Sequence, residues 1–352
     1  MRILQHIVIV LLAGGVIASC SSSQQSTQEF SAPQQEQSPQ SNYYTTAFPH
    51  KDIHDKLKDA QQSVVRIASS GFYDSFTFEG RAITLPDIKT NALKDIATSK
   101  ISTEESTSGT AIIIDRNNSS SLLISCEHTI AFPDTIITYY EGNNIPDETY
   151  IESISIKKNS SHLVYTSTEL KPFKVLATAK RSDLALLSVE FERGNLELYP
   201  LEISAGNSNF LRLGSFMYIL GFPKSYPIVT RGVASSSESW NDRFFVMDAT
   251  FNPGISGGLV LATNDNYNSF EWVGMASSST ATREEVLVPH PEGENYSRIT
   301  RPYTDSVFVQ QKTRINYGIT QAIPINQVKK ILQENRDMLK QKGYRRALEM
   351  GE

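Results

Sequence analysis

Short apolar runs, separated by clusters of Gly, Pro, Asn and Ser, constrain the fold of this chain more than any other feature. Many short strands with turn signals between them are typical of a β-barrel or a β-sandwich. The candidate strands are 110–114, 122–125, 184–189, 216–220, 244–247, 259–262 and 272–276. Helical spacing of apolar residues occurs at 52–62 and again at 325–339. The sequence therefore predicts an all-β domain that ends in a C-terminal helix.

The charge balance and the residue types argue against several kinds of partner. The chain has 352 residues, a formal net charge of -5 and no long basic stretch, which argues against a nucleic acid partner. No cluster with metal-ligand spacing and no phosphate-binding loop is evident in the sequence. We therefore expect no metal and no other cofactor.

The N-terminus has the pattern of an export signal. Residues 7–17 form an uncharged apolar run behind Arg2, too short for a bilayer span, which takes about 20 residues. The run ends at 17–19 and is followed by Cys20, an arrangement that resembles the lipobox of bacterial lipoproteins. The resemblance implies a lipoprotein signal peptide at 1–19 and lipidation of Cys20. An ordinary signal peptide with an incidental cysteine remains an alternative.

The composition also predicts where the folded part begins and ends. Residues 20–46 are rich in Ser, Gln and Pro, and such a segment cannot bury enough surface to offset its ordering entropy. We expect a flexible tether there, a folded domain at 47–345 and a polar tail at 346–352. Cys126 is the only cysteine besides Cys20, so a lipidated Cys20 would leave no internal disulfide.

Three segments carry residues suited to catalysis. Ser256 lies in the run 252–258 (Asn-Pro-Gly-Ile-Ser-Gly-Gly), where the glycines allow a tight turn that points backbone N–H groups toward one spot. His128 follows an apolar strand, and Asp183 begins one. Each has a plainer interpretation: a Gly-Ser loop, a structural histidine and a strand-capping aspartate.

The three residue types together are more informative than each alone. A serine hydroxyl needs a base to act as a nucleophile, and the base needs a carboxylate to orient it. We therefore predict that His128, Asp183 and Ser256 form a catalytic triad. Such a set fits a hydrolase that acts through an acyl-enzyme intermediate.

The chain resembles the trypsin-like proteases of the HtrA/Deg type from about residue 61 to about residue 332. The matching segments are 60–67, 108–115, 221–223, 230–233, 248–258 and 318–326. The resemblance implies two six-stranded β-barrels with the triad in the cleft between them. It implies that the function is hydrolysis of peptide bonds in polypeptide substrates through an acyl-enzyme intermediate. It also implies that the backbone N–H groups of Gly254 and Ser256 form the oxyanion hole, and that Thr250, Ala276 and Ser277 line the substrate pocket.

Some features depart from the family's pattern. Ile255 stands where Asn or Asp usually precedes the nucleophile, so a new N-terminus could not pair with an acid there. We expect no peptide-binding PDZ domain after the terminal helix. The segments 71–106, 133–168 and 277–313 have the character of long insertions.

Other functions remain open at this level. A non-catalytic binding module could keep the same fold. An α/β-hydrolase also has a G-x-S-x-G sequence. That fold requires a helix after the serine, followed by an Asp and a His later in the chain. Here the sequence predicts a strand at 258–261, and His290 lies in a Pro-rich stretch. The expected location is the bacterial cell envelope, with the chain lipid-anchored to a membrane and facing the periplasm or exterior. Assembly into a homo-oligomer is left open.

Overall fold

The computed structural model describes residues 42–140, 150–192, 198–236, 243–289 and 307–352. The chain divides into two units, 1–39 and 40–352, and every described residue belongs to the second. The signal peptide, Cys20 and nearly all of the expected tether therefore lie outside the described residues. Within the described part, none of the helices has the length and apolar character required to cross a membrane.

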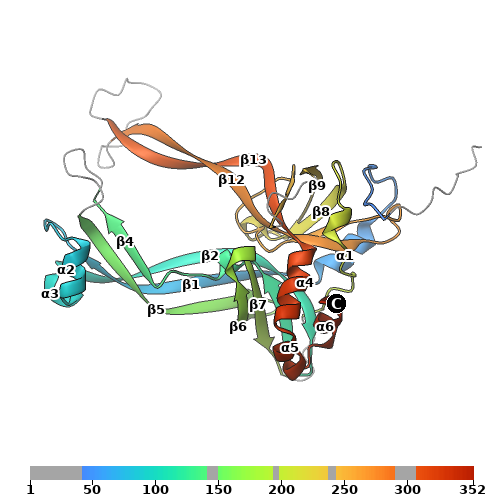
Figure 1. The fold of residues 1–352 in the computed structure, drawn as a ribbon, viewed down its shortest axis with the longest axis horizontal. Helices are drawn as coiled ribbons and strands as arrows, with labels where there is room; N and C mark the ends of the chain where they lie inside the picture. Colours follow the sequence, from blue (N-terminus) through green and yellow to red (C-terminus); the bar gives the residue numbers. More distant parts are fainter. Residues whose placement is uncertain (1–41, 141–149, 193–197, 237–242, 290–306) are drawn as a thin grey trace, which may run out of the picture. The chain divides into compact units, whose positions relative to one another are not determined.

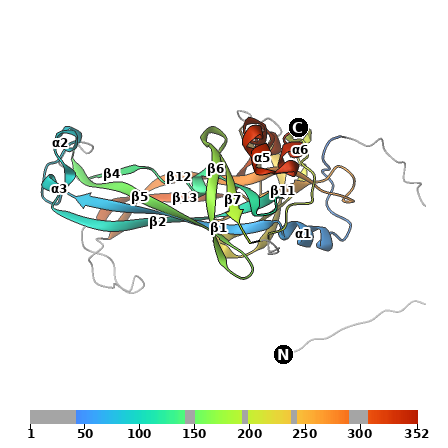
Figure 2. The ribbon, with the colours of Figure 1, turned by 90° about the horizontal axis from the view of Figure 1, so that it is seen from below.

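The first barrel is built from antiparallel strands in the N-terminal half (Figures 1 and 2). Its order is β1-β2-β3-β7-β6-β5, and pairing between β1 and β5 closes it, with β4 added beside β5. The strands are β1 Val64–Thr77, β2 Ser99–Arg116, β3 Ser120–Ser125, β4 Thr135–Tyr139, β5 Ile151–Tyr165, β6 Leu170–Ala179 and β7 Leu184–Glu190.

The central strands of this barrel are buried on both faces. Along β3 and β7, Leu123 and Leu187 join the core inside the barrel. Their neighbours Leu122 and Leu186 join a larger core that also contains residues of the second barrel and the C-terminal helices. Because successive side chains of a strand point to opposite faces, these two apolar strands connect the two cores.

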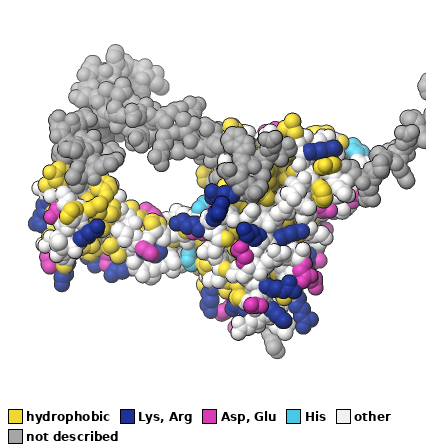
Figure 3. Space-filling view, viewed as in Figure 1, with side chains coloured by type: hydrophobic (Ala, Val, Ile, Leu, Met, Phe, Trp, Pro, Cys, Tyr) yellow, Lys and Arg dark blue, Asp and Glu magenta, His cyan; other side chains and the backbone are white. Residues whose placement is uncertain are grey.

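The segments expected to be insertions largely extend the barrel strands. Residues 71–77 of β1 pair with 99–105 of β2 and with 153–160 of β5, so the three strands continue as one ribbon. The ribbon ends at α2 Leu85–Thr90 and α3 Leu93–Ile96, where Phe78, Ile151 and Ile154 form a small separate core. Hydrophobic side chains gather visibly at this end of the ribbon (Figure 3).

The second barrel is closed in the order β10-β13-β12-β11-β8-β9. Its strands are β8 Phe216–Gly221, β9 Ile228–Ser236, β10 Phe245–Met247, β11 Leu259–Ala262, β12 Glu271–Pro289 and β13 Val307–Pro324. The expected insertion at 277–313 mostly continues β12 and β13, which pair as far as 289 and 307. The prediction of two six-stranded barrels is confirmed, with β4 as an additional strand of the first.

The C-terminal part differs from the sequence prediction in two respects. The helix expected at 325–339 is broken into α4 Ile325–Glu334 and α5 Arg336–Lys342 at Asn335, whose side-chain amide donates to the carbonyl of Ile331. The prediction of a polar tail at 346–352 is wrong. Residues there form α6 Arg345–Met350, because Ala347 can be buried and its N–H donates to the carboxylate of Asp115 at 2.9 Å.

The expected end of the tether at residue 46 is also wrong. Tyr44 is fully buried among core residues of the second barrel, ahead of helix α1 His54–Gln61. Its hydroxyl donates to a carboxylate oxygen of Glu271 at 2.5 Å and accepts from the N–H of Asn207 at 3.1 Å. An aromatic ring with paired polar ends can be buried at little cost, so the folded unit already includes Tyr44.

Candidate active site

His128 and Asp183 are held together by two hydrogen bonds, both accepted by the carboxylate of Asp183. His128 lies in the short 3₁₀ turn Glu127–Thr129 after β3, and Asp183 lies directly before β7, which pairs with β3. The Nδ1 atom of His128 is 2.8 Å from Oδ2 of Asp183, and the backbone N–H of His128 donates to Oδ1 at 2.9 Å. The carboxylate therefore determines both the position and the ring orientation of His128.

The surroundings of Asp183 keep its carboxylate charged. Its side chain is only 14% exposed, whereas that of His128 is 47% exposed. Burial by itself raises the pKa of Asp183, but hydrogen bonds and attraction from His128, together with a hydrogen bond from Ser277, outweigh it and hold the pKa below its ordinary value. The Ser277 hydroxyl donates to Oδ2 at 2.7 Å. An ionised Asp183 can orient the imidazole and stabilise its charged form.

Ser256 lies at the junction of the two barrels and is nearly buried. It belongs to the loop between β10 and β11, and its side chain donates to the backbone carbonyl of Ser277 at 2.7 Å. No hydrogen bond joins Ser256 to His128 within the described part of the chain. Ser277 therefore contacts two of the three predicted triad residues, through its carbonyl and its hydroxyl.

The backbone around Ser256 leaves two N–H groups available. The carbonyl of Pro253 accepts from the N–H of Lys224 at 2.9 Å, and the carbonyl of Ile255 accepts from the N–H of Gly258 at 2.8 Å. A trans peptide points its N–H away from its carbonyl, so the N–H groups of Gly254 and Ser256 point away from these partners. Among the described residues, neither N–H has an acceptor. The two predicted oxyanion donors are thus free to bind an oxyanion.

The glycines of the loop are required by its shape. Gly254 has a φ of 100° and Gly257 a φ of 88°, both in the region that favours glycine. A Cβ atom at Gly257 would lie 1.9 Å from the carbonyl oxygen of Thr110. No other residue could adopt this position without moving the strand beneath it.

Thr110 connects the loop to the first barrel. Its hydroxyl donates to the carbonyl of Gly254 at 2.8 Å and accepts from the N–H of Phe222 at 2.9 Å. Its own N–H donates to the carbonyl of Ser256 at 2.7 Å, and the whole residue is buried. This role was not predicted from the sequence. The available indication was a polar residue at the start of the apolar run 110–114.

Ile255 anchors the loop on its other side. Its side chain is 2% exposed and joins the core of the second barrel. A Cβ atom added at Gly221 would be 3.0 Å from Ile255, which shows how closely the two pack. An apolar contact therefore holds the loop at the position directly before Ser256.

The three residues expected in the substrate pocket differ in position. Ala276 and Ser277 lie beside the loop: the carbonyl of Ala276 accepts from the N–H of Gly257 at 2.7 Å. The Ser277 side chain, however, points to Asp183. Thr250 is exposed, and no described contact connects its side chain with Ser256.

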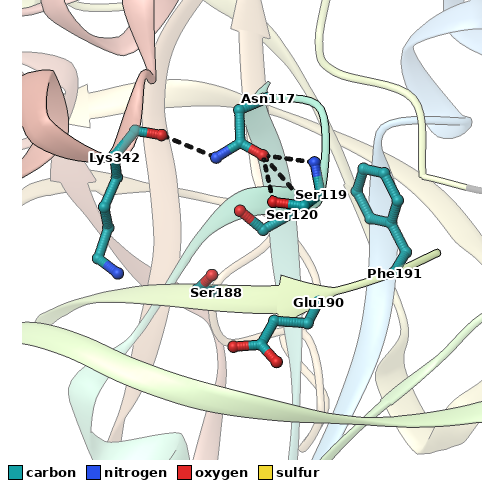
Figure 4. A pocket seen from close by; sticks show the side chains of 7 residues that line it. All are labelled: Asn117, Ser119, Ser120, Ser188, Glu190, Phe191 and Lys342. Carbon is teal, nitrogen blue, oxygen red and sulfur yellow. Dashed lines mark hydrogen bonds between the residues drawn. The ribbon is translucent and has the colours of Figure 1, made fainter. Parts of the chain in front are cut away.

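A polar pocket of about 470 Å³ lies elsewhere on the molecule, between β3, β7 and the end of α5 (Figure 4). Its lining residues are Asn117, Ser119, Ser120, Ser188, Glu190, Phe191 and Lys342. The Asn117 amide donates to the carbonyl of Lys342, and the hydroxyls of Ser120 and Ser188 bond to Tyr344. Since these polar groups already have partners within the chain, we assign no ligand to this pocket.

One family model and solved structures resemble this chain. The family model described as "Trypsin-like peptidase domain" matches residues 109–275, a span that contains His128, Asp183 and Ser256. No curated protein matches the chain. One solved structure that resembles it is the inactive form of a mutant of Rv3671c from M. tuberculosis. That resemblance has 11% sequence identity and a TM-score of 0.41, and it covers 83% of this chain and 96% of the other.

Proposed function

From the trypsin-like peptidase domain that residues 109–275 match, we propose that this chain is a serine endopeptidase with His128, Asp183 and Ser256 as its triad. The observation that carries the proposal is the pair of hydrogen bonds from His128 to the carboxylate of Asp183, together with a serine loop that has two unpaired N–H groups among the described residues. These are the base, its orienting carboxylate and the oxyanion donors that acyl transfer requires.

The proposed reaction begins with a movement of Ser256. Its hydroxyl leaves the Ser277 carbonyl and turns toward Nε2 of His128, which accepts its proton as Oγ attacks the peptide carbonyl. The hydrogen bond from Ser256 to the Ser277 carbonyl contributes only about 0.5–1.5 kcal/mol. Breaking it therefore adds little to the barrier of the reaction. The developing oxyanion is bound by the N–H groups of Gly254 and Ser256.

The second half of the reaction returns the proton. His128 donates it to the leaving amine, and an acyl-enzyme on Ser256 remains. A water molecule, deprotonated by His128, then attacks the ester. The bond from the acyl carbon to Oγ of Ser256 breaks, His128 returns the proton to Oγ, and the new carboxylate leaves. Throughout, Asp183 holds the Nδ1–H of His128 and stabilises the transient imidazolium.

A fluorophosphonate probe tests the proposal directly. We expect labelling of Ser256 in the wild type, its loss in Ser256→Ala, and casein or peptide cleavage reduced by roughly six orders of magnitude in that variant. Ser161→Ala, at an exposed serine of β5, is the matched control and should behave as the wild type. A Ser256→Ala variant that cleaves as fast as the wild type would exclude the triad and favour the binding-module alternative.

We further propose that the peptidase is of the HtrA type and is anchored to the bacterial cell envelope through Cys20. The support is the lipobox-like pattern behind the apolar run at 7–17. Stable anchoring takes two or more acyl chains. Cys20→Ser should therefore shift the protein from the membrane fraction to the soluble fraction. Retention of that variant after a carbonate wash would contradict the anchor.

A further inference from the structure

Cys126 lies next to the proposed base and has no role in the reaction. It is a free cysteine, fully buried, two residues before His128, and its thiol donates weakly to the carbonyl of Ala276 at 3.5 Å. The sulfur of Cys126, a ring nitrogen of His128 and a carboxylate oxygen of Asp183 all lie within 4.8 Å of one another. The strands β3 and β7 thus bring together three potential metal ligands.

We propose that Cys126, His128 and Asp183 bind a soft divalent cation such as Zn²⁺, and that this cation inhibits the enzyme. The inhibition rests on the proposed function, whereas cation binding does not. Sulfur, imidazole and carboxylate are the ligands that zinc takes, at about 2.0–2.3 Å each. Movements on the order of 1 Å would bring the three atoms to those distances. A fourth position would remain for water.

The charges of the three ligands suit a divalent cation in a buried site. On binding, the S–H bond breaks, a Zn–S bond forms and the proton passes to solvent. One thiolate and one carboxylate then neutralise the cation, so no net charge is buried.

The exposure of the ligands provides a route of entry. The His128 side chain is 47% exposed, whereas Cys126 is fully buried. A hydrated cation would therefore meet the imidazole first and reach the thiol last. A cation that cannot bind thiolate well, such as Mg²⁺, would gain little from this site.

Metal binding at this position would stop the proposed reaction. The ring nitrogen that faces Asp183 is Nδ1, at 2.8 Å from the carboxylate. If Nδ1 binds the cation, the single ring proton must be on Nε2, because a neutral imidazole has only one. Nε2 then cannot accept the proton of Ser256. The hydrogen bond that orients the ring is lost at the same time.

Cobalt spectroscopy tests the site without any peptidase assay. Cys20 and Cys126 are the only cysteines, so Cys126 is the sole thiol in a Cys20→Ser/Ser256→Ala chain. Co²⁺ should give this chain a thiolate-to-metal charge-transfer band in the near ultraviolet, and Zn²⁺ should abolish the band by competition. Adding Cys126→Ala should remove the band and weaken Zn²⁺ binding at least about 100-fold in calorimetry. Absence of the band from the Cys126-containing chain would overturn the proposal.

Zinc titration of peptide cleavage tests the inhibition. Each variant is compared with its own metal-free rate: Zn²⁺ should inhibit the wild type, and the inhibition constant should rise at least about 100-fold in Cys126→Ala. Cys126→Ser provides a second variant if the alanine chain folds poorly. Equal zinc sensitivity of the wild type and both variants would overturn the inhibitory site. A cobalt band in a chain whose wild type cleaves nothing would instead refute the proposed function and leave the metal site standing.

Discussion

The hydroxyl of Ser256 donates to the backbone carbonyl of Ser277 at 2.7 Å. The hydroxyl of the same Ser277 donates to Asp183 at 2.7 Å, so one residue contacts both the nucleophile and the orienting carboxylate of the proposed triad. The proposed nucleophile therefore rests on the backbone of β12, and the proposed base is held by Asp183, which Ser277 also contacts. In the proposed reaction, Ser256 must turn toward His128 before attack can begin.

Asp183→Asn should separate the catalytic and structural roles of this residue. The amide can still occupy the site, but it favours the wrong tautomer of His128 and cannot stabilise the imidazolium. Turnover should fall by roughly four orders of magnitude while the fold is kept. Peptide cleavage and circular dichroism of the two chains provide the measurement. A large loss of thermal stability with only a small loss of turnover would show that Asp183 is mainly structural.

Thr110 should act as a positioning residue for the oxyanion loop. Thr110→Val removes the hydroxyl that donates to Gly254 and accepts from Phe222, so two buried backbone groups lose their partner. We expect kcat to fall roughly 10²-fold, comparable to loss of one oxyanion donor, with KM nearly unchanged. Thr110→Ser should restore most of kcat, because it keeps the hydroxyl.

The control for Thr110 is Thr138→Val, at an exposed threonine of β4. It makes the same chemical change without touching the loop, and its kcat should equal that of the wild type. If Thr110→Ser were as slow as Thr110→Val, the threonine would matter for its packing and not for its hydrogen bonds.

The pKa of Asp183 makes a prediction about acid stability. Its folded pKa lies below the ordinary value, so its ionised form stabilises the folded chain. This contribution is fully present above the unfolded pKa of about 3.9 and is lost as pH falls through the lower folded pKa. The difference in unfolding free energy between wild type and Asp183→Asn should therefore be present at pH 5–7 and shrink below about pH 4. Urea unfolding at pH 7 and pH 3 measures it; a difference that grows in acid would contradict the assignment.

Tyr44 should be needed for a stable second barrel. A chain that begins at residue 47 lacks this buried ring and its hydrogen bond to Glu271. We expect Tyr44→Ala to cost about 3–5 kcal/mol of unfolding free energy, as other large aromatic truncations do. Tyr43→Ala, at the exposed neighbouring tyrosine, should cost much less. Equal thermal midpoints for the two variants would show that Tyr44 is not part of the core.

The sequence by itself determined the class of fold and the residues around which the site is built. Apolar runs of strand length, each ended by turn residues, predict β-barrels because that periodicity is local. The role of the glycines around Ser256 could be predicted for the same reason, because a tight turn with positive φ requires glycine at fixed local spacing. The helix at 52–62 was predicted within a few residues, since α1 is His54–Gln61.

Tertiary structure alone decided the contacts that join distant segments. Thr110 and Gly254 are 144 positions apart, and Tyr44 and Glu271 are 227 apart. No local pattern encodes such pairs, because they depend on how the two barrels close and pack. The same packing buries Ala347 of α6, where the composition predicted a polar tail. It also brings Cys126 beside His128 and Asp183, although their spacing in the sequence is not typical of a metal site. Local periodicity thus determines the strands, whereas the polar contacts between them are determined by packing.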